Sequence, residues 1–220
     1  MRTKKRRYME YRAVGSRCAI DLNCLNLSVS RKTVLDILNQ NGFMEVDVDM
    51  ISLARQCIGV SKYRRAARPS EAPNIVDCSS FVKWLYAQRG IWLPRRTIQQ
   101  RQYGKTVDIN ELTAGDLIFL SGRLNYYDDD TTDGVGHVGI ATSKNTVIHA
   151  VNSRVNIIEV PLDVFVDKSK YRGTKRYIPK DADLLTLETP PQREIEVADD
   201  IKWVIFQYLK NKQSGKDNIV

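Results

Sequence analysis

Between residues 46 and 182 the hydrophobic pattern of this chain changes its period once, between residues 90 and 115, and no other feature constrains the fold as strongly. Before this change, apolar residues recur at the three- and four-residue spacing of helices, as in Met50–Ile58 and Cys78–Leu85. After it, short apolar runs predict strands at Leu117–Leu120, His137–Thr142, Thr146–Val151, Val155–Val160 and Thr174–Ile178. Helices followed by strands predict an α+β fold, with helices on a largely antiparallel sheet.

Three parts are predicted along the chain. Residues 1–45 form a basic extension in which Ser30 caps one short helix. Residues 46–182 carry the α+β core, and residues 183–220 form a C-terminal extension. This extension contains an amphipathic helix marked by Ile201, Val204, Ile205 and Tyr208. We expect this helix to dock onto the domain, and self-association through it is the open alternative.

The composition is that of a globular protein. The chain has 220 residues, of which 42% are hydrophobic, enough for an ordinary core. Its net charge of +8 is concentrated at the N-terminus, because residues 1–70 hold 14 Lys and Arg against 6 Asp and Glu. Such an arm could attract nucleic acid, anionic lipid or an anionic polymer. No known nucleic-acid motif accompanies the charge, so we expect a solvated leader and no nucleic-acid partner.

The cysteines and the N-terminus exclude several classes of protein. Four cysteines at these spacings predict reduced thiols, with neither a disulfide scaffold nor zinc knuckles. No apolar run follows the basic residues Lys4 to Arg7, so no signal peptide and no membrane span are predicted. As written, the chain is expected to stay in the cytosol unless another route delivers it elsewhere.

The chain contains only two histidines, His137 and His149, which lie on either side of a predicted β-hairpin. If residues 143–145 form a three-residue loop, Thr142 opposes Thr146 and residues of equal parity share one face of the sheet. Both rings then project to the same side. Their backbones lie roughly 7 to 8 Å apart on a diagonal, within reach of long side chains.

Cys78 is a candidate nucleophile for this histidine pair. If Asp77 caps the following helix, the unpaired N–H groups and the helix dipole at Cys78 favour the thiolate. Gly139 leaves space beside the rings, where a helix carrying Cys78 could dock. His137 would then act as general base and acid, and His149 would hold its tautomer. The open alternative is an inert cysteine on an apolar stripe, the environment that we expect for Cys57.

Five blocks in unbroken order resemble those of the NlpC-type cysteine peptidases. They are Val76-Asp77-Cys78-Ser79-Ser80-Phe81-Val82, Gly90-Ile91-Trp92-Leu93-Pro94-Arg95, Gly115-Asp116-Leu117-Ile118-Phe119, Gly136-His137-Val138-Gly139-Ile140 and Val147-Ile148-His149-Ala150. The resemblance covers about residues 50 to 178. It implies a papain-like core with Cys78 as nucleophile, His137 as base and His149 as orienting residue.

The resemblance also implies a substrate and further site residues. The family hydrolyses peptide bonds in peptidoglycan stem peptides, typically between D-glutamate and a diamino acid, without a metal or organic cofactor. Tyr63 falls at a family tyrosine that helps to hold the developing oxyanion, and the backbone N–H of Cys78 is a second donor. Asp77 and Ser79 are expected to contact substrate. Asp77 is explained equally well as the helix cap.

Three features depart from the family pattern. Ser80 stands where glycine is usual, so its hydroxymethyl group is expected to narrow the cleft or change what it accepts. No secretion signal is predicted from the sequence, although one is expected of a wall enzyme. An enlarged loop before His137 carries Asp128, Asp129, Asp130 and Asp133. We expect a solvated loop there, with a lid or a site for a cationic diamino acid as alternatives.

Three functions therefore remain open from the sequence. The first is a peptidoglycan endopeptidase, with peptidoglycan or muropeptides as its substrate. The second is an amidase or acyltransferase that uses the same Cys-His-His triad. The third is a non-catalytic module that binds the cell wall.

Overall fold

The structure is a computed structural model that describes residues 11–25, 29–122, 134–143 and 145–214. The chain separates into two compact units, the first formed by residues 1–48, 89–92 and 180–220 and the second by 49–88 and 93–179. The predicted boundaries of the three sequence parts stay a prediction. The basic residues Lys4 to Arg7 and the acidic loop residues Asp128 to Asp133 lie outside the described residues.

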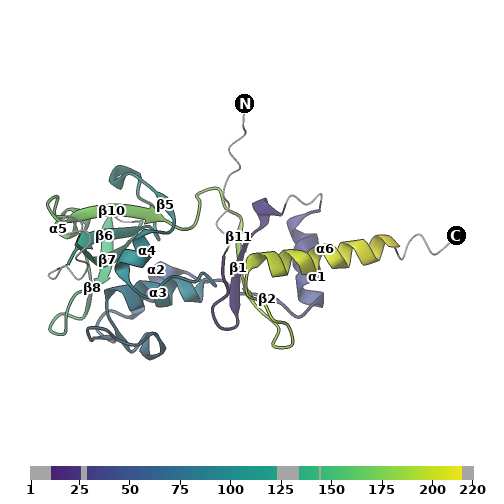
Figure 1. Cartoon of the computed structure of the whole chain (residues 1–220), viewed down its shortest axis with the longest axis horizontal. Coiled ribbons are helices and arrows are strands. Elements are labelled where there is room, and N and C mark those ends of the chain that lie inside the picture. The colour runs from purple at the N-terminus through teal and green to yellow at the C-terminus, as the bar shows by residue number, and fades with distance from the viewer. Residues whose placement is uncertain (1–10, 26–28, 123–133, 144, 215–220) are drawn as a thin grey trace. The chain divides into compact units, whose positions relative to one another are not determined.

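The second unit contains a six-stranded sheet in which each strand is antiparallel to its neighbours (Figure 1). Its order is β5-β10-β6-β7-β8-β9. The bounds are Lys105–Thr106 for β5, Leu117–Ser121 for β6, Val135–Ala141 for β7, Thr146–Ala150 for β8, Ile157–Pro161 for β9 and Tyr171–Arg176 for β10. The α+β class with a largely antiparallel sheet is therefore confirmed.

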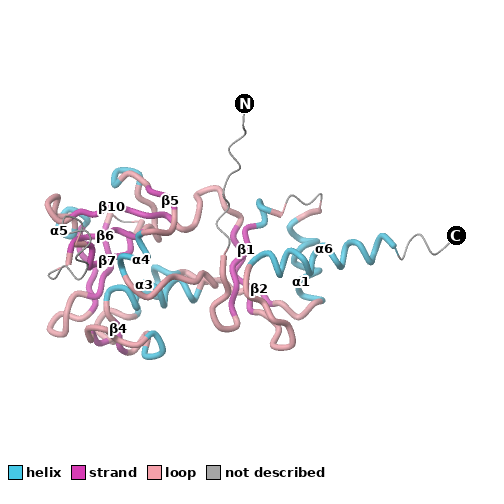
Figure 2. The backbone as a smooth tube through the Cα atoms, in the orientation of Figure 1, coloured by secondary structure: helices cyan, strands magenta, loops and turns pink. Residues whose placement is uncertain are grey.

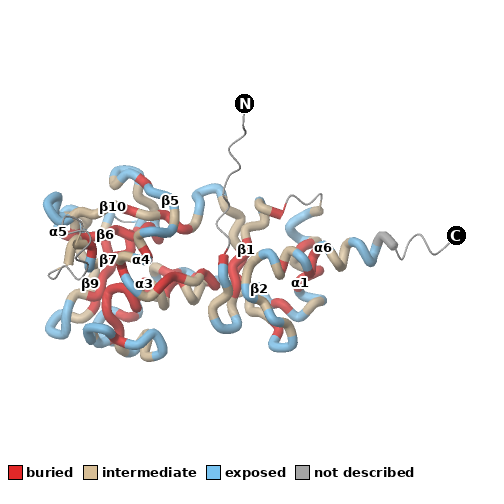
Figure 3. The backbone as a smooth tube through the Cα atoms, viewed as in Figure 1, coloured by how far each residue is buried: buried red, intermediate tan, exposed pale blue. Residues whose placement is uncertain are grey.

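Four α-helices accompany this sheet among the described residues of the second unit. They are α2 at Met50–Gln56, α3 at Cys78–Gln88, α4 at Thr97–Arg101 and α5 at Leu162–Phe165. Two short strands, β3 at Lys62–Tyr63 and β4 at Ile75–Val76, form a separate parallel pair. Helix α3 contacts β7 and β8, and buried residues gather along these three elements (Figure 3).

A buried ion pair connects strand β10 to the turn before β6. The guanidinium of Arg176 donates to both carboxylate oxygens of Asp116, at 2.9 and 2.6 Å. The two side chains are only 9% and 2% exposed. The Thr113 N–H adds a third hydrogen bond to Asp116, at 2.8 Å. The sequence analysis assigned no role to this pair.

We expect Arg176→Met to lower the free energy of unfolding of the second unit by about 3 kcal/mol, because it leaves the buried Asp116 carboxylate without its cation. Arg55→Met is the matched control. Arg55 pairs with Glu159, but its side chain is 35% exposed, so we expect a loss below about 1 kcal/mol. Urea unfolding followed on NMR signals of β6 and β7 measures both. Equal losses would contradict the prediction.

The first unit joins segments from both ends of the chain. Its sheet has the order β1-β11-β2, with β1 at Arg17–Asp21, β11 at Leu184–Glu188 and β2 at Met44–Glu45 (Figure 2). The sequence analysis did not predict these strands. Helix α1 spans Arg31–Gln40, and Ser30 accepts a hydrogen bond from the Thr33 N–H as its cap, which confirms the predicted helix start.

The C-terminal helix α6, at Ala198–Ser214, belongs to this first unit. Its apolar residues Ile201, Val204 and Ile205 are buried in one cluster with residues of α1, β1 and β11. Trp203 and Phe206 lie outside this cluster and are 59% and 43% exposed. Self-association through α6 stays a prediction. None of the helices in the described ranges is long and apolar enough to span a membrane.

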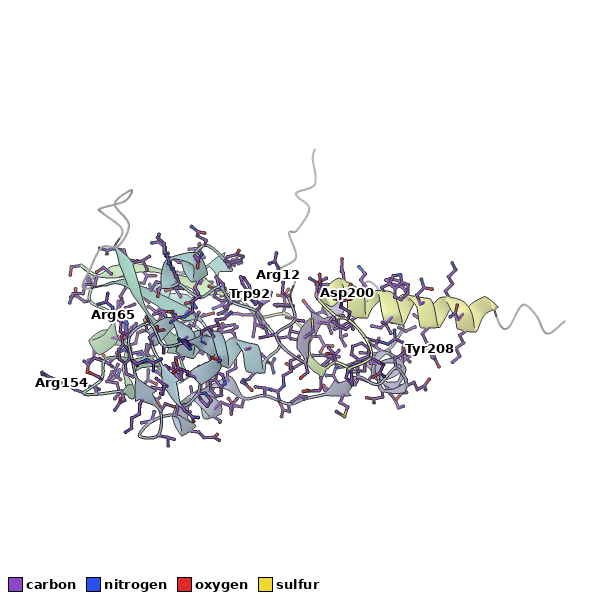
Figure 4. All side chains as sticks on the ribbon, turned by 60° about the horizontal axis from the view of Figure 1, so that its bottom comes forward. Arg12, Arg65, Trp92, Arg154, Asp200 and Tyr208 are labelled. Carbon is purple, nitrogen blue, oxygen red and sulfur yellow. The ribbon has the colours of Figure 1, made fainter. Side chains whose placement is uncertain are left out.

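The N-terminal segment of the described chain is tied to the same unit. The guanidinium of Arg12 lies over the ring of Trp92, 5.5 Å from its centroid, and Figure 4 labels both residues. The backbone of Trp92 also donates a hydrogen bond to the Arg12 carbonyl, at 3.2 Å. Residues 89–92 are grouped with Arg12 in the first unit.

Candidate active site

The two histidines lie side by side on one face of the β7–β8 hairpin. Ile140 pairs with Ile148, and the Thr142 N–H donates to the Thr146 carbonyl, as the predicted three-residue loop requires. His137 Nε2 lies 2.9 Å from His149 Nδ1. The predicted register and the shared face are both confirmed. Because one ring nitrogen of each histidine is used in this contact, Nδ1 remains for His137 to exchange protons elsewhere.

A β-bulge lies at the start of β7, where Cys78, the nucleophile candidate, contacts this strand. The register between β6 and β7 shifts after Leu120, next to Gly136. A Cβ at Gly136 would lie 2.8 Å from the Gly122 Cα, so only glycine allows the two backbones to approach this closely. The Cys78 thiol donates to the Gly136 carbonyl, with 3.8 Å between Sγ and O. Cys78 thus contacts the residue that directly precedes His137.

Burial favours the neutral forms of all three side chains. It raises the pKa of the Cys78 thiol to about 11, and the neighbouring Asp77 charge adds to the rise. Hydrogen bonds with Thr97 and with the backbones of Val138 and Ser79 oppose this rise. Burial also lowers the pKa of His137 to about 4 and, together with His137, that of His149 to about 3. The thiolate predicted from the helix dipole is therefore not the favoured resting form, because burial outweighs the dipole.

The start of α3 is built by a reciprocal pair of hydrogen bonds between Asp77 and Ser80. The Ser80 N–H donates to Asp77 Oδ1, and the Asp77 N–H donates to Ser80 Oγ, both at 2.8 Å. This is the geometry of a capping box, and it confirms Asp77 as the helix cap. Ser80 is 1% exposed, so its hydroxymethyl group completes the cap and does not narrow a cleft.

Arg95 anchors this capped turn, a role that the sequence analysis missed. Its guanidinium donates to both oxygens of Asp77, at 3.1 and 2.5 Å, to Ser79 Oγ at 2.8 Å and to the Ala67 carbonyl at 2.6 Å. Asp77 and Ser79 are 6% and 5% exposed. These contacts account for both side chains without substrate, and their predicted substrate-binding role stays a prediction. The only signal in the sequence was that Arg95 is the last residue of the second quoted block.

We expect Arg95→Met to accelerate hydrogen exchange at the Ser80 and Phe81 amides roughly tenfold or more, because the buried Asp77 carboxylate loses its cation and the first turn of α3 opens more often. Hydrogen–deuterium exchange measured by NMR tests this. Arg96→Met, a change of the exposed neighbouring arginine, is the control and should leave these two amides unchanged. Equal exchange rates in the two variants would contradict an anchoring role.

Tyr63 lies close to the nucleophile candidate, as the resemblance implied. It pairs with Val76 in the β3–β4 ladder, two residues before Cys78, and its N–H donates to Asn156 Oδ1 at 2.9 Å. Burial raises the pKa of Tyr63, and the charges of Cys78 and Asp77 add to the rise. The phenol is therefore in its neutral, hydrogen-bond-donating form near the sulfur. Its role toward an oxyanion stays a prediction.

The space beside the histidine rings is filled by an element that the sequence analysis did not predict. A Cβ on Gly139 would lie 2.9 Å from Phe165 Cζ and 2.5 Å from Val147 Cγ1. The space expected beside the rings at Gly139 therefore holds Phe165 of α5 in place of the start of α3.

The remaining cysteines agree with their predicted states. Cys57 is 5% exposed, as expected for a core residue, and all four cysteines are free. No cluster of His, Cys, Asp or Glu in the described ranges could hold a metal ion.

Comparison with known proteins identifies the family. A family model described as NlpC/P60 matches residues 61–173, which is just over half of the chain and includes Cys78, His137 and His149. The chain belongs to the NlpC/P60 family. A crystal structure of an NlpC/P60 family protein from Bacillus cereus superposes with a TM-score of 0.51 at 27% identity, covering 64% of this chain and 43% of that one.

Two relatives of this NlpC/P60 protein carry names that describe an activity. A γ-D-glutamyl-L-lysine dipeptidyl-peptidase of Bacillus cereus is 31% identical over 103 residues, which is 47% of this chain and 29% of the relative. A γ-DL-glutamyl hydrolase of Bacillus subtilis is 30% identical over 149 residues, 65% of this chain and 33% of the relative. The chain thus spans about a third of the length of these relatives.

Proposed function

We propose that this NlpC/P60 protein is a cysteine endopeptidase that hydrolyses peptide bonds in peptidoglycan stem peptides. The bond that we infer is the one between a D-glutamyl residue and the following diamino acid. The names of the relatives support this class of bond, since they describe γ-glutamyl peptide hydrolysis. The proposed peptidase domain spans residues 46–182, and the family match at 61–173 lies inside it.

One observation carries the proposal. The sulfur of Cys78 contacts the residue before His137, and His137 in turn lies 2.9 Å from His149. A thiol, a base and a group that orients the base are the parts that nucleophilic acyl transfer needs. These two contacts support three roles. Cys78 is the nucleophile, His137 is the general base and acid, and His149 is the residue that holds the His137 tautomer.

The reaction proceeds in two halves from the neutral resting forms. As Cys78 Sγ bonds to the substrate carbonyl carbon, the thiol proton moves to His137. His137 then protonates the departing amine, the C–N bond breaks, and a thioester remains. In the second half, water loses a proton to His137 as it attacks the thioester. The proton returns to Cys78 when the C–S bond breaks. The Cys78 N–H and the Tyr63 hydroxyl are the proposed oxyanion donors.

Incubation with purified sacculi and mass spectrometry of the released fragments test the proposed bond. The expected products carry a new α-amino group on the diamino acid and a free D-glutamyl γ-carboxylate. Added amine separates hydrolysis from acyl transfer, because an acyltransferase would give an amide of the added amine. Products cut at another bond would contradict the proposed substrate. Excess chelator should leave turnover unchanged.

A non-catalytic wall-binding function is favoured by one observation, the burial of the nucleophile candidate. Cys78 is 8% exposed, and its pKa is raised to about 11. Labelling by iodoacetamide at pH 7 separates the two functions. If Cys78 is catalytic, His137 assists its reaction by accepting the thiol proton, so His137→Ala should clearly slow the labelling of Cys78. Labelling that is equally slow with and without the His137 side chain would favour the binding function.

A further inference from the structure

Phe165 lies against both histidine rings. It is the last residue of α5, and its ring centroid lies 4.7 Å from that of His149 and 5.9 Å from that of His137. The contact with His149 is edge-on, with 71° between the ring planes, and the contact with His137 is tilted by 41°. One apolar ring therefore touches both members of the histidine pair.

An apolar cluster and the hairpin loop fix the position of this ring. Phe165 is 6% exposed and packs in a cluster with Ile118, Leu120, Ala141 and Val147. Helix α5 contacts β8 and β9, and its first residue, Leu162, donates a backbone hydrogen bond to the Asn145 carbonyl at 3.0 Å (Figure 1). The ring is thus held by the same hairpin that carries the two histidines.

Gly139 makes this contact possible. It lies between His137 and Val147 on the histidine face of the hairpin, and its missing side chain leaves the volume that Phe165 occupies. Any Cβ there would stand 2.9 Å from Phe165 Cζ, closer than van der Waals contact allows. The glycine and the phenylalanine are therefore complementary in shape, and together they leave little room for water beside the rings.

We propose that Phe165 is a positioning residue, whose ring excludes water from the face that carries His137 and His149 and keeps both imidazoles neutral. The inference rests on the proposed function, in which a neutral His137 accepts the thiol proton. A cation beside an apolar ring loses hydration that the protein does not replace. The lowered pKa values of both histidines agree with this, since burial is their largest cause.

Apolar residues face the pair from the adjacent strands. Leu120 of β6 pairs with His137, and Ile158 of β9 pairs with His149. The surrounding elements also contribute titratable groups, namely Tyr63 of β3, Asp77 and Cys78 at the start of α3, Glu159 of β9 and Asp163 of α5. Of these, Glu159 is paired with Arg55 and Asp163 is exposed.

Titration of the two rings by NMR tests the proposal without substrate. Because the chain has only two histidines, selective imidazole labelling gives two assignable sets of signals. We expect both rings of the wild-type protein to stay neutral down to about pH 5. In Phe165→Ala, water enters and we expect the midpoints to rise by about one to two pH units, toward 6.5. Wild-type rings that titrate near 6.5 would overturn the proposal, whatever the variants do.

Two control variants separate the ring from general destabilisation. Phe165→Leu keeps the site apolar, so its midpoints should rise by less than half as much as those of Phe165→Ala. Leu85→Ala removes a fully buried side chain of α3 and lowers stability, but it should leave the histidine midpoints unchanged. If Leu85→Ala moves the midpoints as far as Phe165→Ala does, the effect is not specific to the ring and the proposal fails.

The pH profile of turnover provides a second measurement. In Phe165→Ala the acidic limb of kcat/KM should move to higher pH by the same one to two units, roughly, while a purely structural loss lowers kcat/KM equally at every pH. Failure of the proposed function stays distinguishable. If Cys78→Ala retains activity, the catalytic assignment falls but the ring titration still reports on Phe165. If Phe165→Ala leaves the titration unchanged, only the present inference falls.

Discussion

Cys78→Ala is expected to reduce kcat/KM for peptidoglycan fragments by roughly 10⁴-fold or more, because no other group at the site can form the thioester. In the proposed mechanism the sulfur is the atom that bonds to the substrate carbonyl, and no neighbouring residue is proposed as a substitute for it. Initial rates on a defined muropeptide, with the products identified by mass spectrometry, measure the loss. The small change in volume should leave the fold intact.

Cys57→Ala is the matched control for this variant. Cys57 is a second buried cysteine of the same unit, 5% exposed against 8% for Cys78. It lies at the end of α2 and has neither an imidazole partner in the proposed triad nor a role in the mechanism. Its replacement should leave kcat/KM within a fewfold of the wild-type value. Turnover by Cys78→Ala at the rate of Cys57→Ala would end the assignment of Cys78 as nucleophile.

His137→Ala is expected to reduce kcat/KM by a similar factor, roughly 10⁴-fold, because the thiol then has no acceptor for its proton and the departing amine has no donor. The pKa of Cys78 is raised by burial, so the thiolate does not form unaided near neutral pH. The residual activity should therefore rise steadily with pH up to about 11. Rates measured between pH 5 and pH 10 test this shape.

His149→Ala and added imidazole act as controls for a catalytic His137. In the proposed mechanism His149 orients the base and does not transfer the proton, so we expect His149→Ala to retain more activity than His137→Ala. Added imidazole should restore part of the rate of His137→Ala, since it can enter the space left by the ring. A loss that is equal in both variants and not rescued by imidazole would indicate a structural role for the pair.

The hairpin could be predicted in detail because its determinants are local. A loop of odd length sets the parity of opposed residues, so His137 and His149 had to share a face once Thr142 lay opposite Thr146. The helix start at Cys78 was equally local, with Asp77 as its cap. Family membership followed from short motifs around these same residues, and it is confirmed by the match over 61–173.

The sheet of the first unit could not be predicted because its contacts are distant in the sequence. β1 pairs with β11, and Cys18 lies opposite Leu187 across most of the chain. Each strand is short, and neither contains an alternating pattern long enough to identify it alone. Helix α5 was not predicted for a related reason, since its four residues are too few to show a helical period. Phe165 was therefore unnoticed although it touches both histidines.

The sequence by itself determined the fold class, the shared face of the two histidines and the candidate nucleophile, because turn length, strand parity and helix caps act between residues close in the chain. Only the tertiary structure decided the charge states. A helix start favours a thiolate in water, but burial raises the pKa of Cys78 and lowers those of His137 and His149. Burial depends on residues such as Phe165 that arrive from elsewhere in the chain, and desolvation outweighs a local dipole.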